Sequence, residues 1–319
     1  MIGRMSVHPG SEIHGRRALV TGATGYLGVA VARRLTSAGW EVHALVRPES
    51  ARMRLTAVLP SDRLHPVGVE VEAISGIAER LRPDAIFHLA AAGRIAHRVA
   101  DIAPMIEANI TLGIAVAEAA AAASAALLVA GSYWEYGEAG ADGPNSLYAA
   151  TKRALDPLLA YYGDRHGVGW TKLVLHDVYG PDDWRRRLVT LLIEAAESSL
   201  PIELTEGLQE IEPLHVDDAA AAFVHAAEAL LGGRATIPVV GIGGGERVTL
   251  RALAALIEAA TGRKIDACWG GRPYPDGQIF RPAKLPLLPS WRPRHRLRDG
   301  IEETVADLRS AQRGDRQKA

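Results

Sequence analysis

Short apolar runs alternate with longer amphipathic stretches along most of the chain. An apolar run of about four to eight residues that ends at turn residues indicates a buried strand, and apolar positions that recur every three or four residues indicate a helix. Strands are predicted at 17–21, 41–46, 84–91, 126–132, 171–180 and 235–243. Helices are predicted at 26–38, 148–166, 185–198 and 215–231. Strands that alternate with helices of this length favour βαβ units and a parallel sheet.

The predicted fold class is therefore α/β, a Rossmann-type doubly wound parallel sheet followed by a smaller, irregular C-terminal lobe. The regular alternation ends near residue 180, and prolines cluster in 269–299. The predicted boundaries are a disordered N-terminus at 1–15, a Rossmann domain at 16–180 to which 210–245 returns, and a lobe made of 181–209 and 246–310.

A glycine-rich turn, VTGATGYLG, joins the first predicted strand to the first helix with a G-x-x-G-x-x-G spacing. In a dinucleotide-binding loop the first glycine permits the tight turn, the second lets the backbone approach the pyrophosphate, and the third allows close helix–sheet contact. The helix N-terminus attracts the anion. Glycines that only form a turn are the alternative. The predicted cofactor-binding residues of this loop are Gly22, Thr24, Gly25, Tyr26, Leu27 and Gly28.

The end of the second predicted strand indicates which dinucleotide is bound. An NAD site usually has Asp or Glu there, which accepts a hydrogen bond from the ribose 2′-hydroxyl. This chain has Arg47 at that position, followed by Arg52 and Arg54. A cation suits a 2′-phosphate, so NADP(H) is favoured and NAD(H) remains possible. The alternative is that the arginines are solvated and Glu49 reaches the ribose.

The stretch SLYAATKRALD places Tyr148 and Lys152 four residues apart on one face of a predicted helix. When such a pair stands alone, surface pairing or packing is the favoured explanation, because Tyr and Lys at this spacing are common by chance. A lysine cation beside a phenol favours the phenolate, as does an oxidised nicotinamide above it. If the pair is catalytic, we expect the pKa of Tyr148 to fall from about 10 toward neutrality.

Composition narrows the class of protein. The net charge of -1 gives no basic surface for nucleic acid, and the single cysteine, Cys268, excludes a disulfide framework. The N-terminus has no apolar signal region, and the apolar run Ile114–Ala130 is expected to be a buried helix followed by a strand. HVDD at 215–218 has no second ligand cluster, so no metal is expected. A cytoplasmic protein that binds neither membrane nor nucleic acid is predicted.

Seven motifs occur in a fixed order: TGATGYLG, HLAA at 88–91, ANITLG with Asn109, GSYWEYG at 131–137, YAATK, VYGP at 178–181 and LHVDD. In this order the motifs resemble the extended short-chain dehydrogenase/reductases, the NAD(P)-dependent epimerase/dehydratase family that acts on nucleotide sugars. The resemblance covers about 16–310. The short loop between GSYWEYG and YAATK is similar to that of CDP-paratose and CDP-abequose synthases, which are 4-ketoreductases of deoxysugar nucleotides.

The resemblance implies roles for individual residues. The catalytic residues implied by it are Ser132, Tyr148, Lys152 and Asn109. Tyr148 and Lys152 also contact the cofactor, and the segment of His88, Leu89, Ala90 and Ala91 lines it. Arg281 matches the arginine that binds the substrate diphosphate in the C-terminal lobe. Tyr133, Trp134 and Asp177 are assigned to the sugar pocket, although aromatic packing and the capping of a turn are the alternatives.

Several reactions of this family remain to be distinguished. Sugar-nucleotide 4,6-dehydratases have an Asp-Glu pair where this chain has Tyr133 and Trp134, so dehydration is not expected. We expect NADPH-dependent reduction of the C4 ketone of a 4-keto-6-deoxyhexose nucleotide. An NAD-dependent C4-epimerase is the alternative, and a non-catalytic NADP sensor is a second one. In this family the helix corresponding to the alanine-rich 115–126 often forms a homodimer interface.

Overall fold

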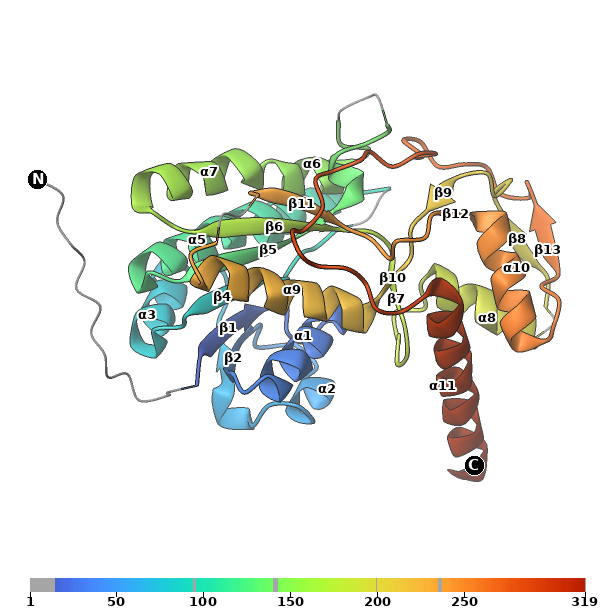
Figure 1. Cartoon of the computed structure of the whole chain (residues 1–319), viewed down its shortest axis with the longest axis horizontal. Coiled ribbons are helices and arrows are strands. Elements are labelled where there is room, and N and C mark those ends of the chain that lie inside the picture. The colour runs from blue at the N-terminus through green and yellow to red at the C-terminus, as the bar shows by residue number, and fades with distance from the viewer. Residues whose placement is uncertain (1–14, 94–95, 140–142, 199, 235–236, 319) are drawn as a thin grey trace, which may run out of the picture.

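A seven-stranded parallel sheet forms the centre of the molecule (Figure 1). The computed structural model describes residues 15–93, 96–139, 143–198, 200–234 and 237–318. The strand order is β11-β6-β5-β4-β1-β2-β3. The strands are β1 (Arg17–Thr21), β2 (Glu41–Val46), β3 (Leu64–Pro66), β4 (Ala85–His88), β5 (Ala126–Ser132), β6 (Trp170–Leu175) and β11 (Val239–Ile242). The predicted doubly wound α/β fold is confirmed. The N-terminal disorder predicted at 1–15 lies, except for residue 15, outside the described residues.

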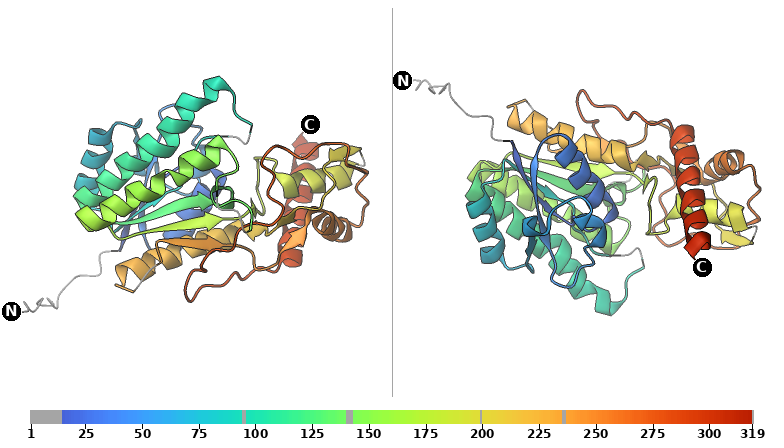
Figure 2. Two further views of the ribbon diagram at one scale, coloured as in Figure 1. Left: turned by 90° about the horizontal axis from the view of Figure 1, so that it is seen from above. Right: turned by 90° about the horizontal axis from the view of Figure 1, so that it is seen from below.

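Helices cover both faces of this sheet (Figure 2). One face carries α1 (Tyr26–Ser37) and α9 (Val216–Leu231), which pack against each other. The other face carries α3 (Val71–Leu81), α5 (Leu112–Ala123) and α7 (Leu155–His166). The shorter helices are α2 (Met53–Thr56), η1 (Ser61–Arg63), η2 (Val99–Asp101), α4 (Ile102–Ile106), η3 (Glu107–Thr111), η4 (Tyr133–Glu135) and α6 (Leu147–Arg153).

The direction of strand addition reverses beside β1. The chain places β2 and β3 on one side of β1, and it then crosses to β4, β5 and β6 on the other side. In doubly wound sheets the crevice outside the carboxyl ends of the strands at such a point is where ligands bind. The glycine-rich turn after β1 and the segment after β4 meet at this point.

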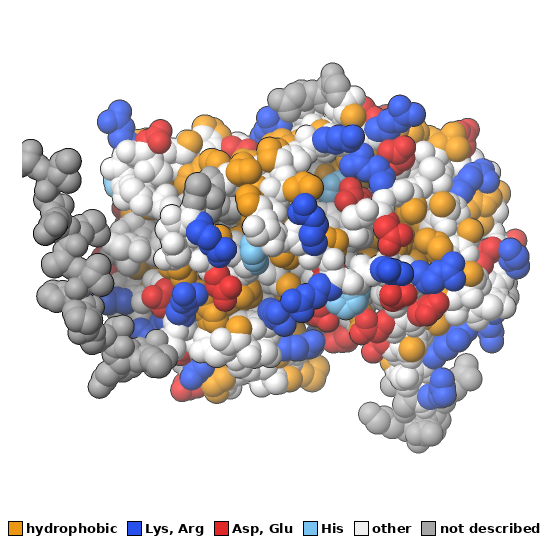
Figure 3. All heavy atoms as spheres, in the orientation of Figure 1, with side chains coloured by type: hydrophobic (Ala, Val, Ile, Leu, Met, Phe, Trp, Pro, Cys, Tyr) orange, Lys and Arg blue, Asp and Glu red, His pale blue; other side chains and the backbone are white. Residues whose placement is uncertain are grey.

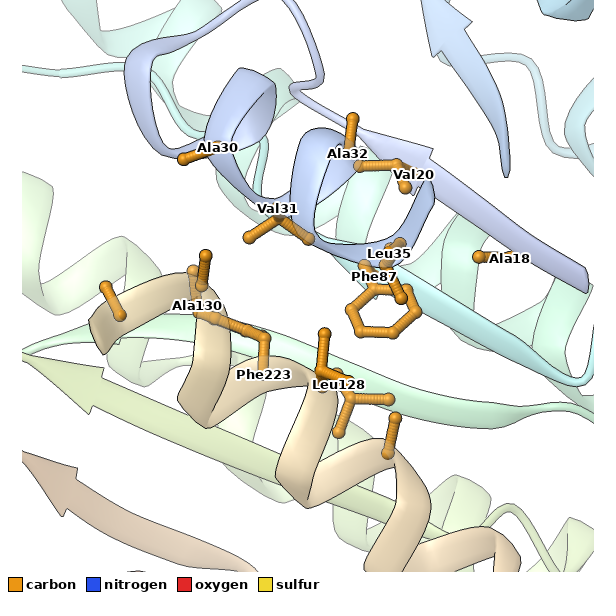
Figure 4. Close-up of a cluster of buried hydrophobic side chains, with 14 of the residues drawn as sticks. Ala18, Val20, Ala30, Val31, Ala32, Leu35, Phe87, Leu128, Ala130 and Phe223 are labelled. Atoms are coloured by element: carbon orange, nitrogen blue, oxygen red, sulfur yellow. The ribbon is translucent and has the colours of Figure 1, made fainter. Parts of the chain in front are cut away.

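The first hydrophobic core lies between the sheet and the α1–α9 face (Figure 4). Val31 and Leu35 of α1, Phe87 of β4 and Leu128 of β5 point toward Phe223 of α9. All five side chains are fully buried. Burying side chains of this kind stabilises the fold by about 1.5–3 kcal/mol each. A second core lies on the opposite face and includes Leu19, Ile86 and Leu127, so the pleat of β1, β4 and β5 alternates between two apolar layers.

The C-terminal lobe has a third, separate hydrophobic cluster. Its helices are α8 (Leu188–Ser198), α10 (Leu250–Thr261) and α11 (Leu297–Lys318). Its short strands pair as β7 (Val178–Tyr179) with β10 (Leu214–His215), β9 (Glu210–Ile211) with β12 (Val248–Thr249), and β8 (Ile202–Leu204) with β13 (Ala267–Trp269). The lobe lies beside the carboxyl ends of the central strands (Figure 1).

Two predicted elements are each divided in the structure. The strand predicted at 171–180 is β6 and β7, because β7 leaves the main sheet and pairs with β10. The helix predicted at 148–166 is α6 and α7, with Ala154 between them. Pro157 lies in the first turn of α7, where its missing N–H removes one bond to the preceding turn.

One helical run, Val99–Ala123, is long and apolar enough to cross a membrane by length and composition alone. Core helices of soluble proteins pass the same test. The α5 part of this run buries Ala115, Val116, Ala119 and Ala120 in the second core. The apolar residues of α5 therefore pack on the sheet, as the sequence predicts for this segment.

Candidate active site

The glycine-rich turn after β1 is shaped by the backbone around it. Gly22 has a φ of 68°, and a Cβ there would lie 2.5 Å from the amide nitrogen of Ala90. A Cβ on Gly28 would lie 2.1 Å from the carbonyl oxygen of Gly22. The turn, the start of α1 and the segment after β4 therefore pack so closely that only glycine fits at these two positions.

The first turn of α1 has amide groups available for an anion. The N-cap is Gly25, so no side chain caps the helix. Orphan N–H groups at a helix N-terminus, together with the helix dipole, bind phosphate groups. Thr24 and Leu27 are half-buried and Gly25 is exposed. An uncapped helix start with an exposed glycine leaves room for a dinucleotide pyrophosphate, and its binding here stays a prediction.

The side chain of Tyr26 has a different environment from that of its neighbours in the loop. It is buried, and its hydroxyl donates a hydrogen bond to the carbonyl oxygen of Pro181 at 2.9 Å. Its ring contacts Trp184 edge-on, with centroids 5.5 Å apart, and Arg185 lies over the ring at 4.2 Å. Only the main chain of Tyr26 is left for a cofactor, and its phenol joins α1 to the lobe.

The ends of β1 and β4 are joined by a buried hydrogen-bond pair. Thr21 Oγ1 lies 2.8 Å from His88 Nδ1 and accepts a hydrogen bond from the Ala90 amide at 3.3 Å. Burial lowers the pKa of His88 to about 3, so its imidazole is neutral. Leu89 and Ala90 are half-buried and Ala91 is exposed next to the glycine-rich turn. The predicted cofactor-lining segment thus lies against the predicted pyrophosphate loop.

The three arginines after β2 differ in what they contact. Arg47 is 76% exposed, and its guanidinium lies 3.4 Å from Glu49. Arg52 donates to the carbonyl of Pro48, and Arg54 lies over the ring of Trp184 at 4.1 Å. Arg47 is therefore the exposed cation that directly follows β2, at the position predicted for a ribose 2′-phosphate.

Tyr148 and Lys152 lie one helical turn apart on α6. Ser146 begins this helix by accepting a hydrogen bond from the Ala149 amide at 3.2 Å. Lys152 is buried, and its Nζ donates to the carbonyl oxygen of Ala130 in β5 at 2.7 Å. The lysine therefore fastens α6 to the carboxyl end of β5.

Ser132 is the last residue of β5 and the N-cap of η4. Its Oγ accepts a long hydrogen bond, 3.4 Å, from the amide of Trp134. The ring of Trp134 stands at 89° to that of Tyr148, with centroids 6.5 Å apart. The serine, tyrosine and lysine of the predicted catalytic set thus lie at the meeting point of β5, η4 and α6.

The pKa of Tyr148 in the protein alone is raised, whereas the sequence predicts a lowered pKa for a catalytic tyrosine beside a lysine and an oxidised nicotinamide. Burial raises the pKa of Tyr148 to about 12, and the Glu135 carboxylate adds to this effect. Arg187 and Lys172 lower it, but they do not outweigh burial. In the protein alone the phenol is therefore protonated at neutral pH, because desolvation of the phenolate exceeds the stabilisation by nearby cations.

Asn109 has every polar atom of its amide in a hydrogen bond. Its Nδ2 donates to the carbonyl of Ala92 at 2.8 Å and to Thr151 Oγ1 at 2.9 Å, while its Oδ1 accepts from the Ala92 amide at 2.9 Å. Thr151 in turn donates to the carbonyl of Tyr148 at 2.9 Å. Asn109 lies in the π-helical turn η3, a distortion often found at functional sites. It holds the loop after β4 against α6.

Tyr133 and its neighbours extend from Ser132 toward the lobe. The Tyr133 ring stacks on His176, with centroids 4.8 Å apart, and its hydroxyl donates to Asp177 Oδ2 at 3.2 Å. Burial raises the pKa of the Asp177 carboxyl, and burial lowers that of His176 to about 4. His176 also faces Glu212 at 3.9 Å. Tyr133 and Trp134 therefore lie beside Ser132, and the Tyr133 hydroxyl holds the Asp177 carboxyl.

A cavity of about 850 Å³ lies where the segment after η4 meets the C-terminal lobe. Its charged lining residues are Glu210, Arg247, Arg281 and Lys284. Arg281 is 75% exposed, and Arg247 pairs with Glu212 at 3.2 Å. Figure 3 shows Lys and Arg side chains gathered over this junction of sheet and lobe. The cavity has an excess of cations, which suits an anionic group of a ligand.

Sequence reasoning did not find Arg247 as a residue of this region, whereas the basic run DDWRRRL at 182–188 was a candidate for the substrate diphosphate, with a solvated surface run as the alternative. Arg247 lies 35 positions from Glu212, and only the pairing of β9 with β12 brings them together. Arg187 belongs to the basic run after β7 and lies near enough to Tyr148 and Asp177 to lower the pKa of both. Its neighbours Arg185 and Arg186 pair with Asp183 and Glu194, respectively.

A cluster of three potential metal ligands lies away from this site. Ligand atoms of His215, Asp217 and His295 are within 4.8 Å of one another. The two imidazole rings are stacked, however, with centroids 3.9 Å apart and planes 22° apart. The nitrogen lone pair of an imidazole lies in the plane of its ring. Because these two rings are nearly parallel, their lone pairs do not point toward a single metal ion. The helix that follows is capped by His215, which accepts from the Asp217 amide, and Asp218 instead binds the main chain at Arg294 and His295.

Known proteins of similar sequence and structure act on nucleotide sugars. A curated UDP-glucose 4-epimerase from Mycolicibacterium smegmatis is 28% identical and is aligned over 92% of this chain and 99% of its own length. A CDP-abequose synthase from Yersinia pseudotuberculosis is 26% identical over 66% of this chain and 72% of its own. The crystal structure of Thermus thermophilus UDP-glucose 4-epimerase in complex with NAD is 26% identical, with a TM-score of 0.76 over 92% of this chain and 99% of that one.

Residues 18–241 match the model of the NAD dependent epimerase/dehydratase family. This match includes the glycine-rich turn, Ser132, Tyr148, Lys152 and the strands that position them. The chain is a member of the NAD-dependent epimerase/dehydratase family and is an enzyme of nucleotide-sugar chemistry within the extended short-chain dehydrogenases/reductases.

Proposed function

We propose that this enzyme uses NADPH to reduce the C4 ketone of a nucleotide-linked 4-keto-6-deoxyhexose. The observation that carries the proposal is Arg47, an exposed cation directly after β2 where a family member specific for NAD usually has a carboxylate. A 2′-phosphate is favourable beside that guanidinium. NADP(H) serves reductases as a reactant that leaves after each turnover, whereas an epimerase keeps its dinucleotide.

The proposed catalytic residues act on one oxygen atom. When bound, NADPH supplies the hydride that adds to C4. Tyr148, which is protonated in the protein alone, donates its proton to the oxygen on C4 as the carbonyl becomes an alcohol. Ser132 donates a hydrogen bond to the same oxygen. Lys152 holds the nicotinamide ribose and the position of α6, and Asn109 holds the loop beside it.

The cavity beside the lobe is the proposed site of the nucleotide diphosphate. Arg281 and Arg247 supply guanidinium groups to it, and Arg187 approaches from the side of Tyr148. The sugar would then lie between this cavity and Ser132, along Tyr133, Trp134 and Asp177. The nucleotide-binding region and the lobe predicted at 181–209 and 246–310 would therefore each contribute to the substrate site.

A second candidate function is an NAD-dependent C4-epimerase. A curated relative and a solved structure that each align over nearly all of this chain are UDP-glucose 4-epimerases, and the solved structure contains NAD. Dehydration has no support, because Tyr133 and Trp134 occupy the acidic positions of a dehydratase. The Ser132, Tyr148 and Lys152 set also disfavours a sensor without catalysis.

A homodimer in the cytoplasm is proposed for the assembly and location of the enzyme. Exposed apolar side chains lie on η2, α4 and α7: Val99 is 86% exposed, Ile106 42% and Tyr161 53%. Contact between two copies would cover them. Sedimentation of the purified chain tests this, since a monomer across micromolar concentrations would contradict it.

The function is tested by following NADPH absorbance at 340 nm. The purified protein is mixed with dTDP-4-keto-6-deoxyglucose or its CDP counterpart, and each assay is repeated with NADH. Oxidation of NADPH, faster than that of NADH, is the expected result. Interconversion of UDP-glucose and UDP-galactose with NAD retained by the protein would instead establish the epimerase.

A further inference from the structure

A buried cation lies directly behind the candidate catalytic residues. Lys172, in β6, is 1% exposed and its Nζ donates to Glu135 Oε2 at 2.7 Å. Glu135 is 0% exposed, and Lys172 also contacts Asp156 of α7. Gly131 leaves room for the lysine, since a Cβ there would lie 3.0 Å from its Cδ.

This ion pair is bonded to the main chain of two candidate catalytic residues. Glu135 Oε1 accepts a hydrogen bond from the amide of Ser132 at 2.7 Å. Lys172 Nζ donates to the carbonyl oxygen of Lys152 at 3.1 Å. One contact therefore fixes the end of β5, and the other fixes the C-terminal turn of α6 relative to β6.

The same pair places opposite charges near Tyr148. Glu135 raises the pKa of the Tyr148 phenol, while Lys172 and Arg187 lower it. Burial lowers the pKa of Lys152, and Glu135 and Asp156 oppose this effect. Removing two charges from water is costly, and well-packed apolar residues often replace a buried pair without loss of stability. A buried pair at this place therefore suggests a task in the active site.

We propose that Glu135 and Lys172 are positioning residues of the active site, whose ion pair fixes the main chain at Ser132 and Lys152 and sets two opposed charges behind the Tyr148 phenol. The proposal rests on the proposed catalytic role of Tyr148. It does not depend on which ketone or nucleotide the enzyme uses.

The test measures the titration of Tyr148 in the protein saturated with NADP⁺. Tyrosinate absorbance at 295 nm is followed against pH for the wild type, E135Q, K172M and E135Q/K172M. The same titration with Y148F added to each background is subtracted. No substrate is needed, so a wrong choice of sugar nucleotide does not affect this readout.

The two single variants are expected to act in opposite directions. E135Q removes an anion and should lower the apparent pKa of Tyr148, while K172M removes a cation and should raise it, each by about half a unit or more. E135Q/K172M removes both charges of the pair that act on the Tyr148 phenol, while Asp156 does not act on it, so the apparent pKa should return to near the wild-type value. E197Q is the matched control, because Glu197 pairs with Arg309 in the lobe and should leave the titration unchanged.

Shifts of the same sign in E135Q and K172M, or no shift in either, would overturn the proposal. If K172M does not fold, the comparison of E135Q with E135Q/K172M decides, since the second change must raise the apparent pKa again. Failure of the proposed reductase function is distinguishable, because it appears as absent NADPH oxidation by the wild type while Tyr148 still titrates.

Discussion

Tyr148 packs so closely on Gly93 that a Cβ on that glycine would lie 2.4 Å from Cδ2 of the ring. Gly93 also has a φ of 149°, which side-chain-bearing residues rarely adopt. The loop after β4 therefore sets the position of the proposed proton donor, and Asn109 holds the same loop through Ala92.

Gly93→Ala is expected to displace the Tyr148 ring. Because a misplacement of about 1 Å can cost about 100-fold in rate, kcat should fall by about 10- to 100-fold. The Kd for NADPH should change by less than about threefold, because the substitution displaces the proton donor and does not remove a contact that holds NADPH in the ground state. Steady-state kinetics and fluorescence titration measure the two quantities. Gly76→Ala on α3 is the control, because its Cβ would meet nothing within 4 Å, and an equal loss of kcat there would contradict the prediction.

Titration of Tyr148 is expected to cause no change in the rate of ketone reduction between pH 7 and pH 9. Its pKa is raised to about 12, so the proton that it donates is present throughout this range and is lost only as the pH rises toward that value. Oxidation of the alcohol requires the phenolate and should accelerate with pH. Tyr148→Phe should lower kcat by about 10²- to 10⁴-fold in both directions. A reduction rate that already declines with an apparent pKa near 7, and that keeps this profile in Y148F, would show that another group titrates.

Arg47→Glu is expected to reverse the preference between the two dinucleotides. The carboxylate would repel a 2′-phosphate and could accept from a 2′-hydroxyl, so kcat/KM for NADPH should fall by about 100-fold while that for NADH stays equal or rises. The exposed Arg80→Glu on α3 makes the same change in net charge away from β2. Equal sensitivity of NADPH and NADH to R47E would remove the basis for preferring NADP.

Acidification is expected to destabilise the fold through His88. Burial lowers the pKa of His88 to about 3 in the folded protein, against about 6.5 in the unfolded chain. The contribution of neutral His88 to the free energy of unfolding is therefore complete above pH 6.5. It is lost as the pH falls toward 3, because the unfolded state takes up the proton first. Each pH unit in this window should cost up to about 1.4 kcal/mol in the free energy of unfolding.

Urea unfolding between pH 7 and pH 4 measures this slope. His88→Asn should flatten it, whereas the same substitution at the exposed His97 should not. An unchanged slope in H88N would assign the acid sensitivity to other groups.

The sequence was sufficient to predict the placement of those parts of the candidate site that are contiguous in the chain. The glycine-rich turn needs only a strand, a turn and a helix in succession, and Tyr148 and Lys152 need only one turn of α6. Contacts across the fold could not be predicted in this way. Lys172 and Glu135 are 37 residues apart and meet only because β6 pairs with β5.

Some signals for those contacts were nevertheless present. A lysine in the apolar run of β6 has to reach a partner or solvent, and the glycine beside it on β5 marks the space that its side chain fills. The division of the strand predicted at 171–180 required knowledge of β10, because β7 pairs with it in place of the central sheet. The pKa of Tyr148 depends on its burial, which the helix pattern alone does not report.

Tyr26 connects the predicted pyrophosphate loop to the C-terminal lobe. Its main chain belongs to the pyrophosphate loop, while its hydroxyl holds Pro181 and its ring contacts Trp184 at the entrance to the lobe. Movement of 181–184 away from the sheet must break that hydrogen bond and uncover the start of α1. Any displacement of the lobe from the sheet is therefore coupled, through this one side chain, to the loop that the sequence predicts to hold the dinucleotide.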